Sequence, residues 1–243
     1  MHKKRGFMQK LLGGIRKACQ QFNLIEDGDK ICVGISGGKD SLTLLSALAR
    51  YQTFSSQKFS LVAVAVDLSD GKHDYSQIES FCQNLGVEFK KVQSNVFEVV
   101  FDIRKEKNPC SLCANMRRGI LNSTAKSLGC NKVALGHHKD DMIETFLISL
   151  FFEGRLSTFK PKSYLSNTDL YVIRPLILCN EEDIEKVSKN YPILKNSCPA
   201  DKHTERERAK SVLANFEKIY PNCKEKLFTA LVHTERYNLL DKE

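Results

Sequence analysis

The chain has 243 residues, of which 42% are hydrophobic and 27% charged, a composition typical of a globular protein with a sizeable core. None of its apolar stretches approaches the roughly 20 residues that a membrane-spanning helix needs, and no signal-peptide pattern follows the basic start of the chain. We therefore expect a cytoplasmic protein that has no membrane partner. The formal net charge of +8 favours a polyanionic partner such as a nucleic acid, although a basic surface is often only a solvated one.

Short apolar runs alternate along the chain with segments in which apolar residues recur at helical spacing. The apolar runs predict strands at residues 30–36, 60–67, 88–93, 132–135 and 171–173. The helical patterns cover residues 8–22, 40–51, 75–85, 111–128, 140–152, 181–190, 204–219 and 223–239. This alternation predicts an α/β fold with a parallel sheet, helices on both of its faces and a helical C-terminal tail. We expect residues 1–199 to form the main domain and residues 200–243 to form the tail.

The most informative segment joins the first expected strand to the helix that follows it. This turn has the sequence Ser36-Gly37-Gly38-Lys39-Asp40-Ser41. A glycine-rich turn between a strand and a helix gathers backbone N–H groups and the positive end of the helix around a small concavity, which favours phosphate. Asp40 adds a carboxylate, and a carboxylate beside a polyphosphate is repulsive unless a divalent cation bridges them. The segment therefore predicts nucleotide binding together with Mg²⁺.

The turn is not a Walker A loop. That loop needs four residues between its glycines and a lysine followed directly by Ser or Thr, whereas here three residues separate Gly34 from Gly38 and Asp40 follows Lys39. The segment instead resembles the SGGxDS signature of the PP-loop ATP pyrophosphatases. That resemblance implies cleavage of ATP between its α and β phosphates and activation of a carbonyl-type oxygen by adenylation.

Other strand ends are expected beside this turn, because ligands of parallel sheets bind beyond the carboxyl ends of the strands. Asp67 ends the second expected strand, and Gly136 and His137 follow the fourth. A histidine at this place suits the positioning of a phosphate or the transfer of a proton. Arg174 follows the fifth strand, where it suits either a phosphate contact or a surface salt bridge.

A second acidic motif, Asp140, Asp141 and Glu144, opens the helix after the fourth strand. Its spacing places Glu144 on the same helix face as the two aspartates. Carboxylates in a first helical turn are stabilised by the helix dipole, so capping is the simpler role for any one of them. Their place after a strand end also suits a Mg²⁺ ion held against ATP, and we take Asp141 as the ligand.

The pair Cys110 and Cys113 is spaced to share one metal or cluster, or to cycle as a dithiol. One further cysteine stands out, Cys198, which lies in an expected loop before Pro199. Three thiolates leave one position unfilled, which is poor for structural zinc and suitable for an iron–sulfur cluster with one open iron. Zinc or a dithiol pair with a buried Cys198 is the alternative. Cys32, Cys82 and Cys130 lie in or beside apolar patterns and are expected in the core.

Taken in order, several motifs resemble the tRNA 2-thiocytidine biosynthesis family, TtcA, from about residue 16 to residue 198. These motifs are Cys110-Ser111-Leu112-Cys113, Arg117-Arg118-Gly119-Ile120-Leu121, Gly136-His137-His138-Lys139-Asp140-Asp141, Glu144-Thr145 and Ile173-Arg174-Pro175-Leu176. Two features depart from the family pattern as we know it. Cys198 stands alone where a second cysteine pair is common, and the chain is short at both ends.

The resemblance implies a [4Fe-4S] cluster ligated by Cys110, Cys113 and Cys198, whose free iron carries the sulfur to be transferred. It implies ATP binding by Ser36, Gly37, Gly38, Lys39, Asp40, Ser41, Asp67, Gly136, His137 and Asp141. Asp40 and Asp141 are the carboxylates expected to hold Mg²⁺, and Arg117 with Arg118 is expected to guide RNA or bind ATP. The catalytic residues are then Asp40 and the three cysteines.

The expected activity is an ATP-dependent sulfurtransferase that adenylates and then thiolates C2 of a cytidine in a tRNA anticodon loop, at position 32. Its partners are tRNA and a sulfur donor such as a cysteine desulfurase or free sulfide, and a homodimer is compatible with this interpretation. Two alternatives remain open. The sulfur acceptor is another RNA or a small molecule, or the chain is a non-catalytic iron–sulfur protein that binds RNA or senses redox state.

Overall fold

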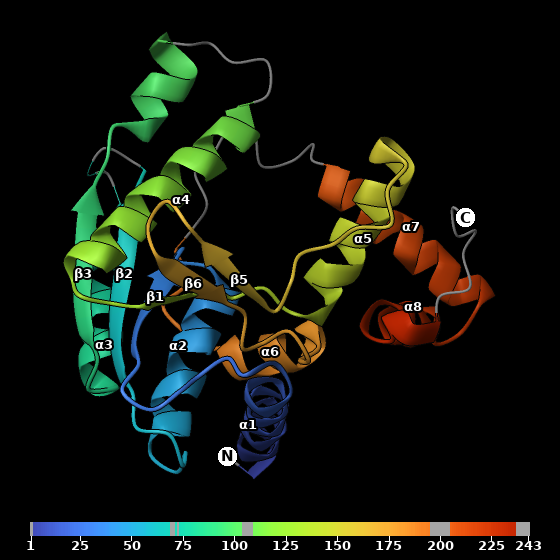
Figure 1. Ribbon diagram of the computed structural model, residues 1–243, viewed down its shortest axis with the longest axis horizontal. Coiled ribbons are helices and arrows are strands. Elements are labelled where there is room, and N and C mark those ends of the chain that lie inside the picture. Colours follow the sequence, from blue (N-terminus) through green and yellow to red (C-terminus); the bar gives the residue numbers. More distant parts are fainter. Residues whose placement is uncertain (1, 69–70, 72, 104–108, 195–204, 237–243) are drawn as a thin grey trace. The chain divides into compact units, whose positions relative to one another are not determined.

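The computed structural model describes residues 2–68, 71, 73–103, 109–194 and 205–236 (Figure 1). The chain divides into two compact units, one made of Met1–His138 with Lys160–Ala200 and the other of Lys139–Phe159 with Asp201–Glu243. This division differs from the expected boundary at residue 199, because the helix that opens at Lys139 packs with the C-terminal helices.

The first unit is built on a six-stranded sheet in the order β3-β2-β1-β4-β6-β5. Five neighbouring strands are parallel, and β5 pairs antiparallel with β6 at one edge. The strands are β1 (Lys30–Ile35), β2 (Ser60–Asp67), β3 (Glu88–Gln93), β4 (Lys132–Ala134), β5 (Lys162–Leu165) and β6 (Leu170–Ile173). The expected parallel α/β sheet is therefore confirmed, while the antiparallel strand β5 was not predicted.

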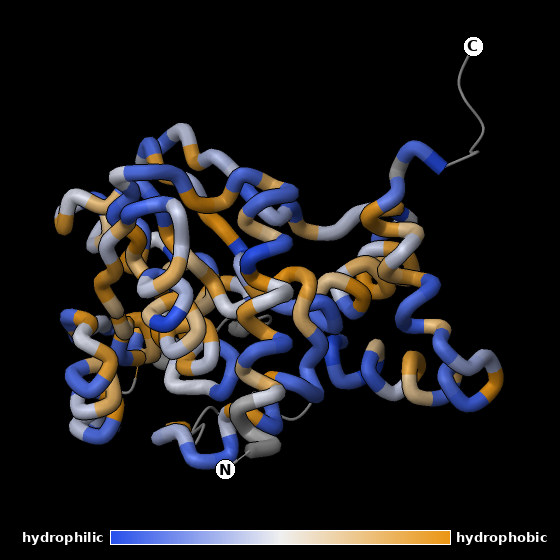
Figure 2. Tube along the Cα trace, turned by 90° about the horizontal axis from the view of Figure 1, so that it is seen from below, coloured by the Kyte–Doolittle hydropathy of each residue, from blue (hydrophilic) through white to orange (hydrophobic). Residues whose placement is uncertain are grey.

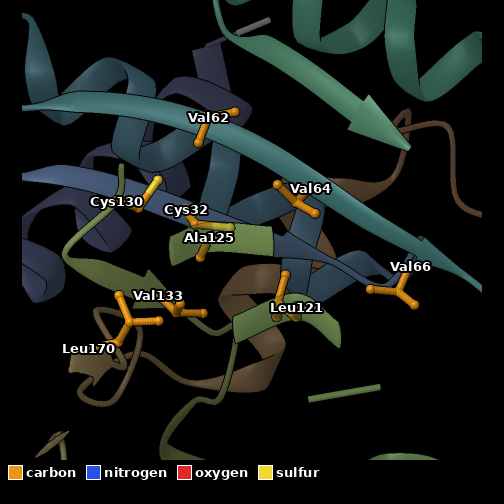
Figure 3. Packing of buried hydrophobic residues seen from close by; sticks show 9 residues of the cluster. All are labelled: Cys32, Val62, Val64, Val66, Leu121, Ala125, Cys130, Val133 and Leu170. Carbon is orange, nitrogen blue, oxygen red and sulfur yellow. The ribbon is translucent and has the colours of Figure 1, made fainter. Parts of the chain in front are cut away.

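The helices of this unit are α1 (His2–Phe22), α2 (Lys39–Gln52), α3 (Ser76–Asn84), α4 (Pro109–Ser127) and α6 (Glu181–Ser188), together with a π-helix at Glu98–Ile103. On one face of the sheet, α4 packs Leu121 and Ala125 against alternate residues of β1, β2 and β4 (Figure 3). The residues between them, such as Val33 and Ala63, point to the opposite face and are also fully buried. Both faces are thus covered, as parallel sheets require.

The expected core cysteines lie in this packing. Cys32 and Cys130 belong to the cluster under α4, and Cys82 is fully buried on α3 (Figure 3). Burial raises the pKa of each of these thiols. They are therefore small apolar core residues, as the sequence predicted.

The second unit consists of α5 (Lys139–Glu153), α7 (Glu205–Ile219), α8 (Cys223–Val232) and a short 3₁₀ helix at Thr234–Arg236. Its small core contains Ile143 and Leu147 from α5 and Leu213 from α7, with α8 residues packed against them. The three helices hold one another through this cluster, so the C-terminal tail is a folded unit that includes a helix from the middle of the chain.

Within the part of the chain that the structure describes, no helix is long and apolar enough to cross a membrane. Hydrophobic segments along the trace are interrupted by hydrophilic ones, as Figure 2 shows. This pattern agrees with helices that bury one side in a core and expose the other to water.

Candidate active site

The candidate site lies at the carboxyl edge of the parallel strands in the first unit. Strand β1 is followed in the chain by its neighbour β2 on one side, whereas its other neighbour, β4, comes much later. The connections therefore diverge between β1 and β4, and such switch points form ligand crevices at the carboxyl ends of strands. Ser36 follows β1 and Gly136 follows β4, so both predicted residues flank this point.

The loop from Ser36 to Ser41 is closed by its own hydrogen bonds. Gly37 has a φ of +82°, a conformation that a side chain disfavours. The Ser36 backbone N–H donates to Ser41 Oγ at 3.2 Å, and Ser41 Oγ donates to the Gly38 carbonyl at 3.0 Å. The Gly38 N–H donates to Ser36 Oγ at 3.2 Å. These bonds fix the backbone in a tight turn before any ligand arrives.

The amino end of α2 opens from this turn. Its N-cap is Gly38, and no side chain in the described part of the protein makes a capping hydrogen bond there. The first N–H groups of a helix have no partner within the helix and carry its positive dipole end. Their position at the switch point gives an anion site of the kind that suits phosphate.

The residues that follow strand β4 contact this turn directly. A Cβ placed on Gly136 would lie 3.0 Å from the Asp40 carbonyl carbon and 3.1 Å from the Ser41 nitrogen, so only glycine fits without moving the loop. The next residues continue the contact, because Nε2 of the buried His138 lies 3.7 Å from Asp40 Oδ1. The structure therefore brings the predicted Gly136 and Asp40 together.

His137 contacts Arg174. The Arg174 Nε donates to His137 Nδ1 at 3.3 Å, and its Nη1 donates to the Lys160 carbonyl at 2.6 Å. Because a guanidinium only donates, Nδ1 acts as the acceptor and the ring proton of a neutral His137 sits on Nε2. Burial, helped by the charge of Arg118, lowers the pKa of Arg174 to about 10, so the guanidinium stays charged at neutral pH.

Lys39 lies between two carboxylates, one of which the sequence did not single out. Its Nζ donates to Asp40 Oδ1 at 3.1 Å and to Glu181 Oε1, on α6, at 2.8 Å. Burial works to lower the pKa of Lys39, but the hydrogen bond to Glu181 and the charge of Asp40 outweigh it and raise that pKa. The only sequence signal for Glu181 was its place in the first turn of a helix.

The chain after α6 returns to the same loop. The Leu194 N–H donates to the Gly37 carbonyl at 3.0 Å, and the Leu194 side chain fills the space beside Gly37. Tyr191 Oη donates to Ser46 Oγ on α2 at 3.0 Å. The predicted ligand Cys198 lies four positions beyond Leu194 and outside the described residues.

Cys113 lies on the first turns of α4, and this end of α4 belongs to the carboxyl edge of the sheet. The helix runs toward the start of β4 and therefore antiparallel to the strands (Figure 1). Leu121 of α4 packs against one face of the sheet. Cys113 precedes Leu121 by eight residues and therefore lies about 12 Å closer to the amino end of the helix. Cys113 is partly exposed, unlike the buried core cysteines. The side chain of Cys110 lies outside what the structure describes.

Two arginines follow Cys113 on the same helix. Arg117 and Arg118 are exposed, and Arg118 Nη2 donates to Asn115 Oδ1 at 2.7 Å.

Burial and the neighbouring Asp67 carboxylate raise the pKa of Tyr75, while the charge of Arg117 opposes this shift. Asp67, Tyr75 and Arg117 are therefore neighbours at the end of β2. The Asp67 side chain is fully buried there, and its predicted role in ATP binding stays a prediction.

The second acidic motif belongs to the helical unit, where cations of the C-terminal helices face it. Arg206 Nη1 donates to Asp141 Oδ1 at 2.6 Å, and Lys224 Nζ donates to Asp140 Oδ1 at 3.1 Å. Glu144, 3% exposed at its side chain, lies 3.8 Å from Arg206 Nε. Among the described residues, no group of three or more His, Cys, Asp or Glu side chains is arranged to hold a metal ion. Asp141 therefore has an arginine partner that the sequence did not predict.

Comparisons with known proteins match most of the chain. Residues 12–213 match the model of the PP-loop domain family. A tRNA-cytidine(32) 2-sulfurtransferase of Vibrio vulnificus (strain YJ016) is 40% identical over 231 residues, which cover 93% of this chain and 74% of that protein. A protein of the same description from Idiomarina loihiensis is 41% identical over 229 residues, which cover 93% of this chain and 76% of that protein.

A solved structure shares the fold. It is the U34-tRNA thiolase NcsA from Methanococcus maripaludis with its [4Fe-4S] cluster, and it matches with a TM-score of 0.75 at 24% identity. The match covers 98% of this chain and 82% of that one.

Proposed function

This chain belongs to the PP-loop family of tRNA-cytidine(32) 2-sulfurtransferases, and we propose that it is an ATP-dependent enzyme that thiolates a tRNA cytidine at C2. The observation that carries the proposal is the loop from Ser36 to Ser41, with an open helix amino end and Asp40 at the switch point of the sheet. The comparisons support tRNA thiolation. The adenylation step, the use of a cluster and the residue roles are part of our proposal. Because the proposed substrate is tRNA, we propose that the reaction takes place in the cytoplasm.

The proposed reaction has two steps. The C2 oxygen of cytosine attacks the α-phosphorus of ATP, and pyrophosphate leaves. A sulfur nucleophile then attacks C2, and AMP leaves with the oxygen, so a poor leaving group has become a good one. The N–H groups at the start of α2 would stabilise the negative charge that develops on the phosphate oxygens. The base has to leave its stack to be reached, which is easiest in a tRNA loop.

The loop fits Mg²⁺ and ATP better than the helical unit does. The Asp40 side chain is 34% exposed beside the helix end, so its carboxylate is available to a metal ion that neutralises phosphate. Asp141 is 13% exposed and bonded to Arg206, so a metal ion at Asp141 would have to displace that arginine. We propose Asp40 as the Mg²⁺ ligand of this loop. For Asp141, in the helical unit, a role as a Mg²⁺ ligand stays a prediction.

The environment of Cys113 fits a cluster ligand. It is partly exposed near a helix amino end, with Arg117 one turn further along, and both features favour a thiolate. Cys198 follows Leu194 by four residues in the sequence. We propose that Cys110, Cys113 and Cys198 hold a [4Fe-4S] cluster, which would supply the activated sulfur when bound. The sulfur donor is then a desulfurase or free sulfide.

The test is turnover with defined products. Protein reconstituted with iron and sulfide without air should convert ATP and tRNA into AMP, pyrophosphate and 2-thiocytidine, measured by nucleotide chromatography and nucleoside mass spectrometry. The Asp40→Ala variant should lose turnover and keep its circular dichroism spectrum, because a loop carboxylate contributes little to the core. ADP as the main nucleotide product would contradict the assignment.

The cluster is tested by iron content. Cys113→Ser and Cys110→Ser should lose the iron, whereas Cys223→Ser should keep it. Cys223 is a matched control because it is also partly exposed but lies on α8, where Glu217 is its partner. If Cys198→Ser keeps full iron and activity, the third ligand is a different cysteine.

A further inference from the structure

Glu181 is the partner of Lys39 that comes from outside the loop. Lys39 Nζ lies 2.8 Å from Glu181 Oε1, and 3.1 and 3.4 Å from the two Asp40 oxygens. An ammonium has three N–H donors and no acceptor. Asp40 and Glu181 each accept from one of these donors, which leaves the third N–H for a ligand. The exposed fractions of the Lys39, Asp40 and Glu181 side chains are 26%, 34% and 21%, so the cluster is half-enclosed and still open to a ligand.

The helix that carries Glu181 is well anchored. Ile184 and Val187 of α6 are fully buried, and Asp183 forms an ion pair with Lys10 of α1 at 2.7 Å. Helix α6 packs on α2 as well as on α1, and Leu194 beyond it is hydrogen-bonded to the loop. Glu181 therefore presents its carboxylate from a fixed element, whereas Asp40 shares the loop with Lys39 and also faces His138.

In this arrangement Asp40 and Glu181 have different roles. Asp40 adjoins Lys39 in sequence, and in the proposed reaction its oxygens turn to Mg²⁺. Glu181 accepts a direct hydrogen bond from the ammonium and belongs to a different element, helix α6. A flexible lysine side chain loses much rotamer freedom when it is held in place, so a pre-positioned lysine binds phosphate at a smaller entropic cost.

We propose that Glu181 is a positioning residue for the nucleotide: it holds the Lys39 ammonium at the mouth of the loop so that the remaining N–H faces the phosphates of ATP. The inference rests on the proposed function. It assigns Glu181 no contact with the reacting atoms, and its effect passes through Lys39. Removing the carboxylate should therefore weaken ATP binding and leave the later chemistry less affected.

The test is the equilibrium affinity of the full chain for ATP with Mg²⁺, measured by calorimetry without tRNA. Glu181→Ala should weaken binding about tenfold, and Glu181→Gln, which keeps an oxygen acceptor, should weaken it only about threefold. The matched control is Glu182→Ala, because Glu182 is 74% exposed on the same helical turn and pairs with Lys186 instead. This control should bind ATP like the unchanged protein.

A double-mutant cycle with Lys39→Ala decides whether Glu181 acts through the lysine. We expect Glu181→Ala to cause no further loss once Lys39 is absent. The inference is overturned if the two losses add fully, or if Glu181→Ala binds ATP as tightly as the control. If the unchanged protein itself binds no ATP, the proposed function fails and this inference falls with it, which is a distinct outcome.

Discussion

Lys132 is a buried lysine at the amino edge of the sheet, away from the candidate site. Its side chain is 1% exposed, and its Nζ lies 2.7 Å from both Asp29 Oδ2 and Glu26 Oε2. The Asp29 side chain is 3% exposed and also accepts the Glu26 N–H at 2.6 Å and Asn131 Nδ2 at 2.7 Å. The lysine therefore neutralises a carboxylate that water does not reach.

We predict that Lys132→Met lowers the free energy of unfolding by about 3–5 kcal/mol, because it leaves the Asp29 charge buried without its cation. Urea denaturation measures this change. The control is Lys126→Ala, which removes an exposed pair with Asp169 and should leave the urea midpoint almost unchanged. Equal shifts for the two variants would contradict the account of the buried pair.

Lys132 also gives a pH dependence through its other carboxylate partner, Glu26. The hydrogen bond and charge of Lys132 lower the pKa of Glu26 below 4.5. A carboxyl group whose pKa is lower in the folded state stabilises the fold above its unfolded pKa, and this contribution is lost as the pH falls through the folded value. The contribution of Glu26 should therefore be complete at neutral pH and decline below about pH 4.5.

Gly136 is the residue whose size the candidate site depends on most directly. We predict that Gly136→Ala weakens ATP binding, because its Cβ would meet backbone atoms of Asp40 and Ser41 at 3.0–3.1 Å and push the loop away. Gly119→Ala is the control, since nothing lies within 4 Å of that Cβ and alanine favours a helix. Calorimetric ATP titration of both variants tests this, and unchanged affinity in Gly136→Ala would show that the loop adapts.

At the scale of elements, the sheet could be predicted from sequence because its strands are buried on both faces and therefore read as continuous apolar runs. The apolar run that became β1 is an example, with Ile31, Cys32 and Val33 all fully buried. Strand β5 has no such run: it is a four-residue antiparallel edge with Tyr164 exposed, so neither composition nor periodicity marks it.

In the candidate site, too, some features could be predicted from the sequence and others could not. The loop from Ser36 to Ser41 is local in sequence, so its turn and helix start could be predicted from residue order. The pairing of Lys39 with Glu181 joins residues 142 positions apart, and that of Asp141 with Arg206 joins residues 65 apart. Side-chain contacts between distant elements depend on packing that a single sequence does not encode in any local pattern. The roles of Cys110, Cys113 and Cys198 as cluster ligands remain predictions.

Within the helical unit, Arg206 joins α7 to α5 through Asp141 and the buried Glu144. We predict that Arg206→Ala costs about 1–3 kcal/mol locally, because Asp141 loses a charged hydrogen bond and the buried Glu144 loses a nearby cation. Amide hydrogen exchange should then quicken in α5 and α7 and stay unchanged in the sheet. Arg208→Ala is the control, since its exposed partner Glu205 lies on the same helix. Unchanged exchange in Arg206→Ala would mean that apolar packing alone holds the unit.

At the scale of the whole molecule, both the net charge and the architecture are consistent with the proposed tRNA substrate. A net charge of +8 suits a polyanionic substrate, and the arginines after Cys113 extend from the edge of the sheet that carries the nucleotide loop. The loop from Ser36 to Ser41 and the exposed Arg117 and Arg118 thus belong to the same unit, the one built on the sheet. Its helical partner unit carries its own core and its own ion pairs.

The most direct test of the central claim is the 2-thiocytidine content of tRNA from cells that lack this gene, measured by nucleoside mass spectrometry. We predict that the modification disappears on deletion and returns when the unchanged gene is supplied. It should not return with the Asp40→Ala or Cys113→Ser variant. Unchanged 2-thiocytidine after deletion would contradict the proposed substrate.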